Sequence, residues 1–131
     1  MTEEEIRAAE SQLGFKLPKC YTEPMLALGE ELDSFGMNPD VEGGLCTTAE
    51  DLVGTQAAAV EAALCVNEEM VDWWAQYFAI AQDGGGGYYL LKRDGSPEVF
   101  LTDSDWYEEP RPVSPTFSTF LESVQSDEWP D

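Results

Sequence analysis

The residues of this 131-residue chain that could carry out chemistry are almost all carboxylates. There are 27 Asp and Glu residues, 6 Lys and Arg residues and no His, which gives a formal net charge of −21. Without His, the usual general base and the usual activator of a nucleophilic Ser or Cys are missing. Paired carboxylates could serve a glycosidase, but carboxylates are too abundant here to single out one pair. We therefore expect no catalytic residues and no enzyme activity.

Cysteines and glycines are the remaining candidates for a metal or cofactor site. Cys20, Cys46 and Cys65 form no C-x-x-C pair, which argues against structural zinc in a chain without His. Glycines 84–87 could approach a phosphate closely, yet no Lys-Ser/Thr follows them as in a P-loop. A hairpin turn is the favoured interpretation of these glycines. We expect neither a metal nor a cofactor.

The densest group of carboxylates lies in the segment 103–109, where acids stand on both sides of an aromatic pair. An EF-hand loop would need Asp or Asn at its fifth position and Gly at its sixth, where Tyr107 and Glu108 stand. The segment is either a solvated loop or a recognition loop with two aromatic anchors inside an acidic rim. The candidate partner-binding residues are Asp103, Asp105, Trp106, Tyr107, Glu108 and Glu109.

A second aromatic and acidic group is the Trp73-Trp74 pair, which follows Glu68, Glu69 and Asp72. Neighbours on a helix point about 100° apart, so one Trp can lie in the core while the other faces solvent or a partner. Core packing of at least one Trp is favoured. Further acids in the glycine-containing stretch 33–44 could belong to the same rim as the segment 103–109, but the sequence does not fix their position.

The basic residues are scattered along the sequence and predict no basic patch; they are Arg7, Lys16, Lys19, Lys92, Arg93 and Arg111. This excludes nucleic acid, whose phosphates must be neutralised, and also an anionic membrane surface. No signal peptide and no apolar stretch of about 18 residues is visible. We expect a cytoplasmic protein, and self-repulsion at this charge favours a monomer.

The first half of the chain reads as helices. Thr2 and Glu5 match a capping box, and Gly14 is suited to end the helix that follows. Pro18 suits the first turn of a second helix, whose apolar positions extend to residue 32. Residues 33–44 read as a loop and 49–76 as mostly helical, with breaks at Gly54 and Asn67. Candidate core positions there are Leu52, Val53, Val60, Leu64, Val71 and Trp74.

The second half predicts a sheet and a closing helix. Short apolar runs at 78–81, 88–91 and 98–101 are separated by the turns 83–87 and Asp94-Gly95, the latter typical of a type I′ hairpin. These runs predict a three-stranded antiparallel meander. Ser114-Pro115 is then expected to open a last helix with Ser114 as its cap and with Phe117, Phe120, Leu121 and Val124 as its apolar face. The expected fold is one α+β domain over residues 1–126, followed by a short acidic tail at 127–131.

Motifs along most of the chain resemble the SUKH superfamily. The opening Ile6…Glu10…Leu13-Gly14-Phe15-Lys16-Leu17-Pro18…Tyr21 is similar to its "I-x-x-x-E-x-x-L-G-x-x-L-P-x-x-Y" pattern. Residues 78–91 resemble the family's hairpin, and 117–121 its closing "s-F-x-x-F-L" helix. The "N-G" common after the second helix and the "D-H-x" common after the third strand are absent. The resemblance implies helices around a mixed or antiparallel sheet and, for many bacterial members, neutralisation of a polymorphic toxin, often a nuclease.

Three hypotheses remain open from these observations. The first is an immunity protein that binds a cognate toxin domain, which we expect to be basic, and occludes its active site with an acidic surface. The second is a non-enzymatic regulatory or scaffold domain of the same fold that binds another protein. The third is that the acidity is an adaptation to salt or for solubility, in which case stability should rise steadily in molar salt.

Overall fold

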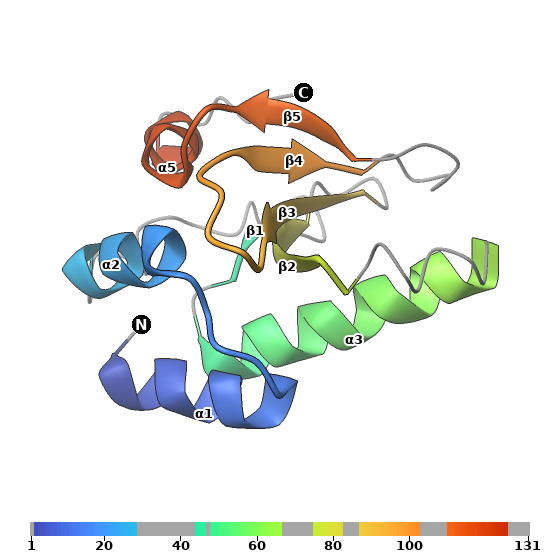
Figure 1. Ribbon diagram of the computed structural model, residues 1–131, viewed down its shortest axis with the longest axis horizontal. Helices are drawn as coiled ribbons and strands as arrows, with labels where there is room; N and C mark the ends of the chain where they lie inside the picture. The colour runs from blue at the N-terminus through green and yellow to red at the C-terminus, as the bar shows by residue number, and fades with distance from the viewer. Residues whose placement is uncertain are drawn as a thin grey trace.

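The computed structural model describes residues 2–28, 44–46, 48–66, 75–82, 87–102 and 110–125. Within them the helices are α1 (Glu3–Leu13), α2 (Lys19–Leu28), α3 (Ala49–Val66) and α5 (Phe117–Gln125). The strands are β1 (Gly44–Leu45), β2 (Tyr77–Gln82), β3 (Tyr88–Lys92), β4 (Val99–Leu101) and β5 (Arg111–Ser114). Figure 1 shows the sheet with helices packed around it. The α+β fold expected from the sequence is confirmed.

The sheet is an antiparallel meander in the order β1-β2-β3-β4-β5. The expected three strands are its centre, and the short edge strands β1 and β5 extend it beyond the expectation. In β5, Arg111 pairs with Leu101 and Ser114 with Val99, so Ser114 belongs to a strand. Pro112 lies in this edge strand, where a missing N–H is tolerated.

A bulge interrupts β2 at Ile80, and a side chain from α3 covers it. Ala79 pairs with Leu90 and Ala81 with Tyr89, which leaves Ile80 as the extra residue. The buried amide of Gln56 accepts a hydrogen bond from the Ala79 N–H at 2.8 Å and donates one to the Ala79 carbonyl. The Gln56 side chain thereby satisfies the backbone groups of Ala79 as a neighbouring strand would, and it links α3 to β2.

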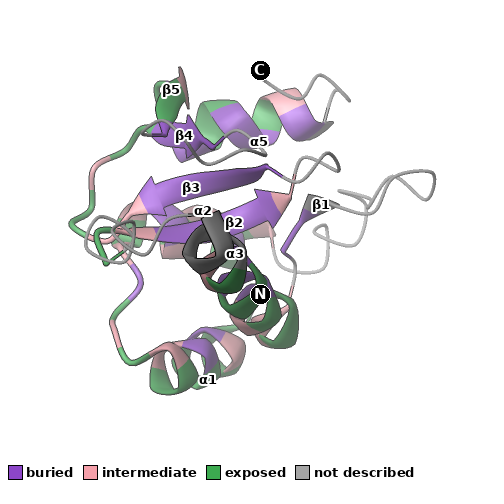
Figure 2. Ribbon diagram, turned by 90° about the vertical axis from the view of Figure 1, so that its right-hand side faces the viewer, coloured by how far each residue is buried: buried purple, intermediate pink, exposed green. Residues whose placement is uncertain are grey.

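Both faces of the sheet are buried, which explains why the strands are continuously apolar rather than alternating. One face carries Phe78, Tyr89 and Leu101 into a cluster with α1, α2, α5 and the start of α3. The other carries Leu90 and Phe100 toward Ala59 in the middle of α3. Figure 2 shows the strands β2, β3 and β4 largely in the purple of buried residues, whereas α1 is largely in the green of exposed residues.

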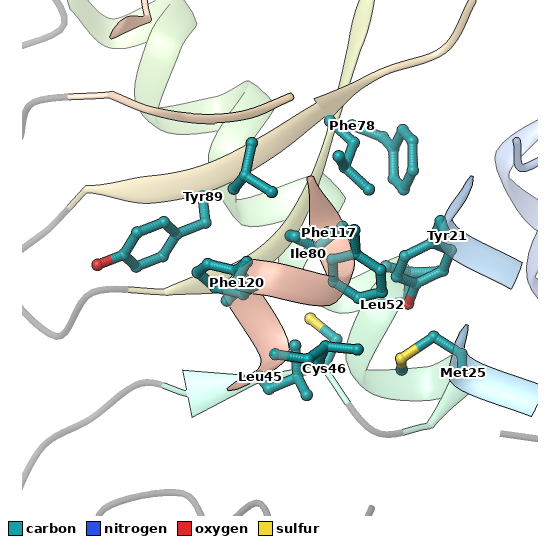
Figure 3. Packing of buried hydrophobic residues seen from close by; sticks show 14 of the residues in the cluster. Tyr21, Met25, Leu45, Cys46, Leu52, Phe78, Ile80, Tyr89, Phe117 and Phe120 are labelled. Carbon is teal, nitrogen blue, oxygen red and sulfur yellow. The ribbon is translucent and has the colours of Figure 1, made fainter. Parts of the chain in front are cut away.

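An aromatic group forms the centre of the larger cluster (Figure 3). The ring centroid of Tyr21 lies 5.3 Å from that of Phe78, edge to face, and 5.1 Å from that of Phe117. Tyr89 and Phe120 have ring centroids 4.9 Å apart. Such pairs each contribute about 0.5–1.5 kcal/mol beyond the area they bury. They join α2 and α5, which are distant in sequence, to β2 and β3.

The helix boundaries follow local signals in part. The capping box of Thr2 and Glu5 is present, and Gly14 ends α1 with a left-handed φ of 83°. The prediction that Gly54 breaks the third helix is wrong, because α3 continues through it. Its cost in a helix, about 1 kcal/mol, is outweighed by buried neighbours such as Leu52 and Gln56. Asn67, the other expected break, lies outside the described residues.

The predicted cap of the last helix is also wrong. Ser114 ends β5, and α5 begins at Phe117, two residues later than a Ser114 cap would place its first residue. Thr116 caps it instead, since its hydroxyl accepts the Thr119 N–H at 3.1 Å. The helical face of Phe117, Phe120, Leu121 and Val124 is buried as predicted.

Candidate functional site

The predicted partner-binding residues Asp103, Asp105, Trp106, Tyr107, Glu108 and Glu109 lie outside the described residues. The structure does describe the residues at each side of them. Thr102 follows β4 and Pro110 precedes β5, and both are buried. The segment 103–109 therefore connects two adjacent antiparallel strands and leaves the sheet at one end, which we call the acidic-loop end.

Hydrogen bonds to β3 fix the chain where this segment begins. The Thr102 N–H donates to the Tyr88 carbonyl at 3.0 Å, and the Tyr88 N–H donates to Thr102 Oγ1 at 3.0 Å. Both groups are buried, so these bonds are sheltered from water. They extend the β3–β4 pairing by one residue, to Thr102.

Two other segments meet the sheet at this same end. Gly44 of β1 pairs with Gln82 of β2, which in turn pairs with Tyr88 of β3. The residues before Gly44, those between Gln82 and Gly87, and the segment 103–109 are thus attached side by side. The segments 29–43, 83–86 and 103–109 carry five, one and four acidic residues and no Lys or Arg. Asp33, Asp40, Glu42, Trp73 and Trp74 lie outside the described residues.

The opposite end of the sheet holds a pocket of about 550 Å³, which we call the basic pocket. It lies between α1, α2 and the turn that joins β3 to β4. Its apolar wall includes Ile6, Leu17 and Leu26. Four of the 6 basic residues of the chain line it, namely Arg7, Lys16, Lys19 and Arg93. The prediction that the basic residues make no patch is therefore wrong.

Local structure places each of these cations. Arg7 lies on α1, and the turn ending that helix at Gly14 leads directly to Lys16. Leu17 is buried there, and its N–H donates to Glu10 Oε2 at 2.8 Å, which fixes the connection to α2. Lys19 is the first residue of α2, whose first turn contains no acidic residue. The helix α1 and its short connection to α2 thus bring three cations to one wall.

Arg93 supplies the fourth cation from the other wall. Its Nε donates to the Tyr77 carbonyl at 2.7 Å, and its guanidinium carbon lies 3.8 Å from the centroid of the Phe15 ring. Burial lowers the pKa of Arg93 from its ordinary value, because the charged form is partly removed from water. The guanidinium is thus held in one orientation, stacked on an aromatic ring, and remains charged at neutral pH.

Three carboxylates also line the pocket: Glu3, Glu10 and Asp94. One oxygen of Glu10 accepts the Leu17 N–H, and Asp94 Oδ1 accepts both the Ser96 N–H and its hydroxyl, at 2.9 and 2.8 Å. Those hydrogen bonds lower the pKa of Asp94. Across the part of the chain that the structure describes, Arg7, Lys16 and Lys19 form no ion pair. The pocket therefore holds four cations and three carboxylates, and three of the cations make no direct ion pair with the carboxylates that line it.

The described thiols do not suggest a reactive site. Cys46 is buried, donates to Thr55 Oγ1 at 3.3 Å, and has its pKa raised to about 12 by burial. Burial also raises the pKa of Cys20. Both shifts disfavour the nucleophilic thiolate. Among the residues described, no group of three or more His, Cys, Asp and Glu side chains could hold a metal ion.

The sequence contained a weak signal for the basic pocket, which is the place of its basic residues relative to the ends of helices and strands. Lys16 lies in the connection between α1 and α2, Lys19 begins α2, and Arg93 begins the turn after β3, so all three lie at or near element boundaries. Only the packing of α1 and α2 against β2 and β3 brings these boundaries together.

As for membrane insertion, none of the described helices is long and apolar enough to cross a bilayer.

Comparison with known proteins adds one positive finding. A model described as SMI1 / KNR4 family (SUKH-1) matches residues 1–123. The matched range runs from α1 into α5, so it includes the basic pocket and the acidic-loop end. Neither a curated protein nor a solved structure matches the chain.

Proposed function

The chain belongs to the SMI1 / KNR4 (SUKH-1) family, and on that premise we propose that it is an immunity protein that neutralises a cognate polymorphic toxin. The match over residues 1–123 is the observation that carries the proposal, because many bacterial SUKH proteins have this role. The net charge of −21 supports it further. A nuclease toxin has a basic cleft for its phosphate substrate, and an acidic protein complements such a cleft.

The proposed binding surface is the acidic-loop end, with contacts from Asp103, Asp105, Trp106, Tyr107, Glu108 and Glu109. The acids would speed association with a basic toxin and repel its nucleic-acid substrate. Trp106 and Tyr107 would supply apolar contact area with few rotamers to lose. The bonds between Thr102 and Tyr88 support this choice, because they anchor the segment to a rigid sheet.

A pull-down from the source cells tests the function directly. The purified protein is used as bait at low and at moderate salt, and the bound proteins are identified by mass spectrometry. A basic toxin-like domain that is retained at low salt and lost as salt rises is the expected result. A neutral housekeeping protein retained at both salt concentrations would contradict the immunity role and favour a regulatory or scaffold domain.

The binding surface is tested by removing charge at one end while keeping the net charge matched. In one variant, Asp103→Asn, Asp105→Asn, Glu108→Gln and Glu109→Gln remove four carboxylates. In the control, Gln replaces four exposed acids elsewhere, Glu23, Glu61, Glu98 and Glu122. We expect the first variant to bind the captured toxin about tenfold more weakly at low salt than the control. Equal affinities would overturn the assignment of the surface, though not the function.

A further inference from the structure

The distribution of charge around the basic pocket is opposite to that of the rest of the chain. Four basic and three acidic residues line it, which leaves two of the 6 basic and twenty-four of the 27 acidic residues outside. One of the two, Lys92, has its Nζ 5.3 Å from the Phe100 ring centroid, on the other face of the sheet. A chain selected only for acidity would have no reason to gather its few cations in one place.

The cations in the pocket are not explained by neutralisation of local acids. Within the described residues Arg7, Lys16 and Lys19 make no ion pair, while Glu10 and Asp94 accept hydrogen bonds from Leu17 and Ser96. Like charges held close together repel each other, and each Lys or Arg keeps several N–H donors available. An anion placed among them would relieve this repulsion and accept those donors.

We propose that the basic pocket is a binding site for a small ligand that carries a compact oxyanion, either a phosphate monoester or a carboxylate. Arg93 is the fixed point of this site, because Tyr77 and Phe15 hold its guanidinium in place. The exposed side chains of Arg7, Lys16 and Lys19 close on the anion from the opposite wall. Ile6, Leu17 and Leu26 offer an apolar surface to the uncharged body of the ligand.

Size and long-range charge favour a small ligand over a polyanion. A volume of about 550 Å³ lies within the range of about 300–1,000 Å³ typical of small-molecule sites. The net charge of −21 repels a nucleic acid, whose phosphates would extend beyond the pocket. A compact anion keeps its charge inside the pocket, within a Debye length of about 8 Å of the cations. The inference is independent of the toxin-binding role proposed above.

Titration of the protein with two anions, followed by amide NMR shifts, tests the proposal. Inorganic phosphate and succinate are used as probes for the phosphate and carboxylate forms, and sodium chloride keeps the ionic strength constant. We expect saturable shifts of the Lys19, Thr22 and Gly95 amides with at least one probe. The probe that binds more tightly identifies the oxyanion. No saturable shift at these amides with either probe up to about 10 mM would overturn the proposal.

A matched pair of variants separates specific binding from a general effect of charge. Lys16→Gln with Lys19→Gln removes two exposed pocket cations, and Lys92→Gln with Arg111→Gln removes two cations outside the pocket. Neither pair includes Arg93, whose hydrogen bond and stacking support the fold. A bond to a charged group corresponds to about tenfold in affinity, so the first pair should weaken binding about a hundredfold. Equal weakening by both pairs would contradict a specific site.

Discussion

The two ends of the sheet differ in charge and in how they are built. At the acidic-loop end, the segments 29–43, 83–86 and 103–109 carry ten acids and no base, and short strand extensions attach them. At the other end, helices and a turn surround a pocket lined by four cations. The comparison shows that the net charge of −21 does not describe how charge is distributed, because four of the 6 basic residues line one pocket.

Packing differs between the two ends as much as charge does. The basic pocket lies against the large aromatic cluster, because Phe15 contacts both Arg93 and Phe78, with a ring-centroid distance of 5.9 Å to Phe78. Among the described residues of the acidic-loop end, Thr102 is joined to Tyr88 by backbone and hydroxyl hydrogen bonds. We therefore expect core substitutions to disturb the basic pocket, and hydroxyl substitutions to affect the acidic-loop end.

The largest effect on stability is expected from Phe78→Ala, which removes the ring that packs against both Phe15 and Tyr21. Phe78 is fully buried, so its truncation should lower the free energy of unfolding by about 3–5 kcal/mol. Urea unfolding followed by fluorescence measures this loss. In the fraction that stays folded, phosphate binding at the basic pocket should weaken, while toxin binding should change little. A loss below about 1 kcal/mol would show that the ring does not support this end.

An intermediate effect on stability is expected from a change of pH, through the buried thiol of Cys46. The pKa of Cys46 is raised from 9.0 to about 12 in the folded protein, so the unfolded chain releases this proton first as pH rises. Stability from this group is complete below pH 9 and is lost progressively up to about pH 12. Between pH 8 and 10 the loss from one such thiol is about 1.4 kcal/mol.

The contribution of the Cys46 thiol to the pH dependence of stability is measured by comparing the protein with its Cys46→Ala variant. Burial also raises the pKa of Tyr21, which acts in the same direction and remains in both proteins. The difference in urea stability between pH 8 and pH 10 should therefore be smaller in the variant by about 1.4 kcal/mol. An identical pH dependence in the two proteins would mean that Cys46 ionises in the fold as readily as in the unfolded chain.

The smallest effect is expected from Thr102→Val, which removes one hydroxyl at the acidic-loop end and keeps the side-chain shape. The Tyr88 N–H then loses its acceptor, and stability should fall by about 1 kcal/mol. Ser114→Ala, at the other end of β5, serves as a control for loss of a buried hydroxyl. Thr102→Val alone should weaken binding of the captured toxin. Equal toxin affinities in the two variants would mean that the hydrogen bond between Thr102 and Tyr88 does not support the toxin-binding surface.

Local signals predicted much of the fold because their physics is local. The capping box of Thr2 and Glu5 and the left-handed Gly14 each involve hydrogen bonds within a few residues, and both are confirmed. The apolar face of α5 is confirmed for the same reason. Gly54 was misjudged because burial of its neighbours outweighs its intrinsic preference, and β1 was missed because a two-residue strand depends on a distant partner.

Of the two candidate sites, one could be proposed from the sequence and the other required the tertiary structure. The aromatic pair between acids in the segment 103–109 is visible in the sequence, so a recognition loop could be proposed from residue types alone, and it stays a prediction. The basic pocket could not be foreseen, because Arg7, Lys16 and Lys19 are separated from Arg93 by more than half of the chain. Counting charges along the sequence gave the wrong conclusion that no basic patch exists.

The sequence by itself determined the α+β class, the family and the excess of carboxylates, because composition, short-range capping and apolar periodicity act within a few residues. Only the tertiary structure decided how the charges are shared between the two ends. The antiparallel meander sends alternate connections to opposite ends of the sheet, and the packing of α1 and α2 then brings the cations together. Charge is set residue by residue, whereas a site requires that residues distant along the chain be neighbours in space.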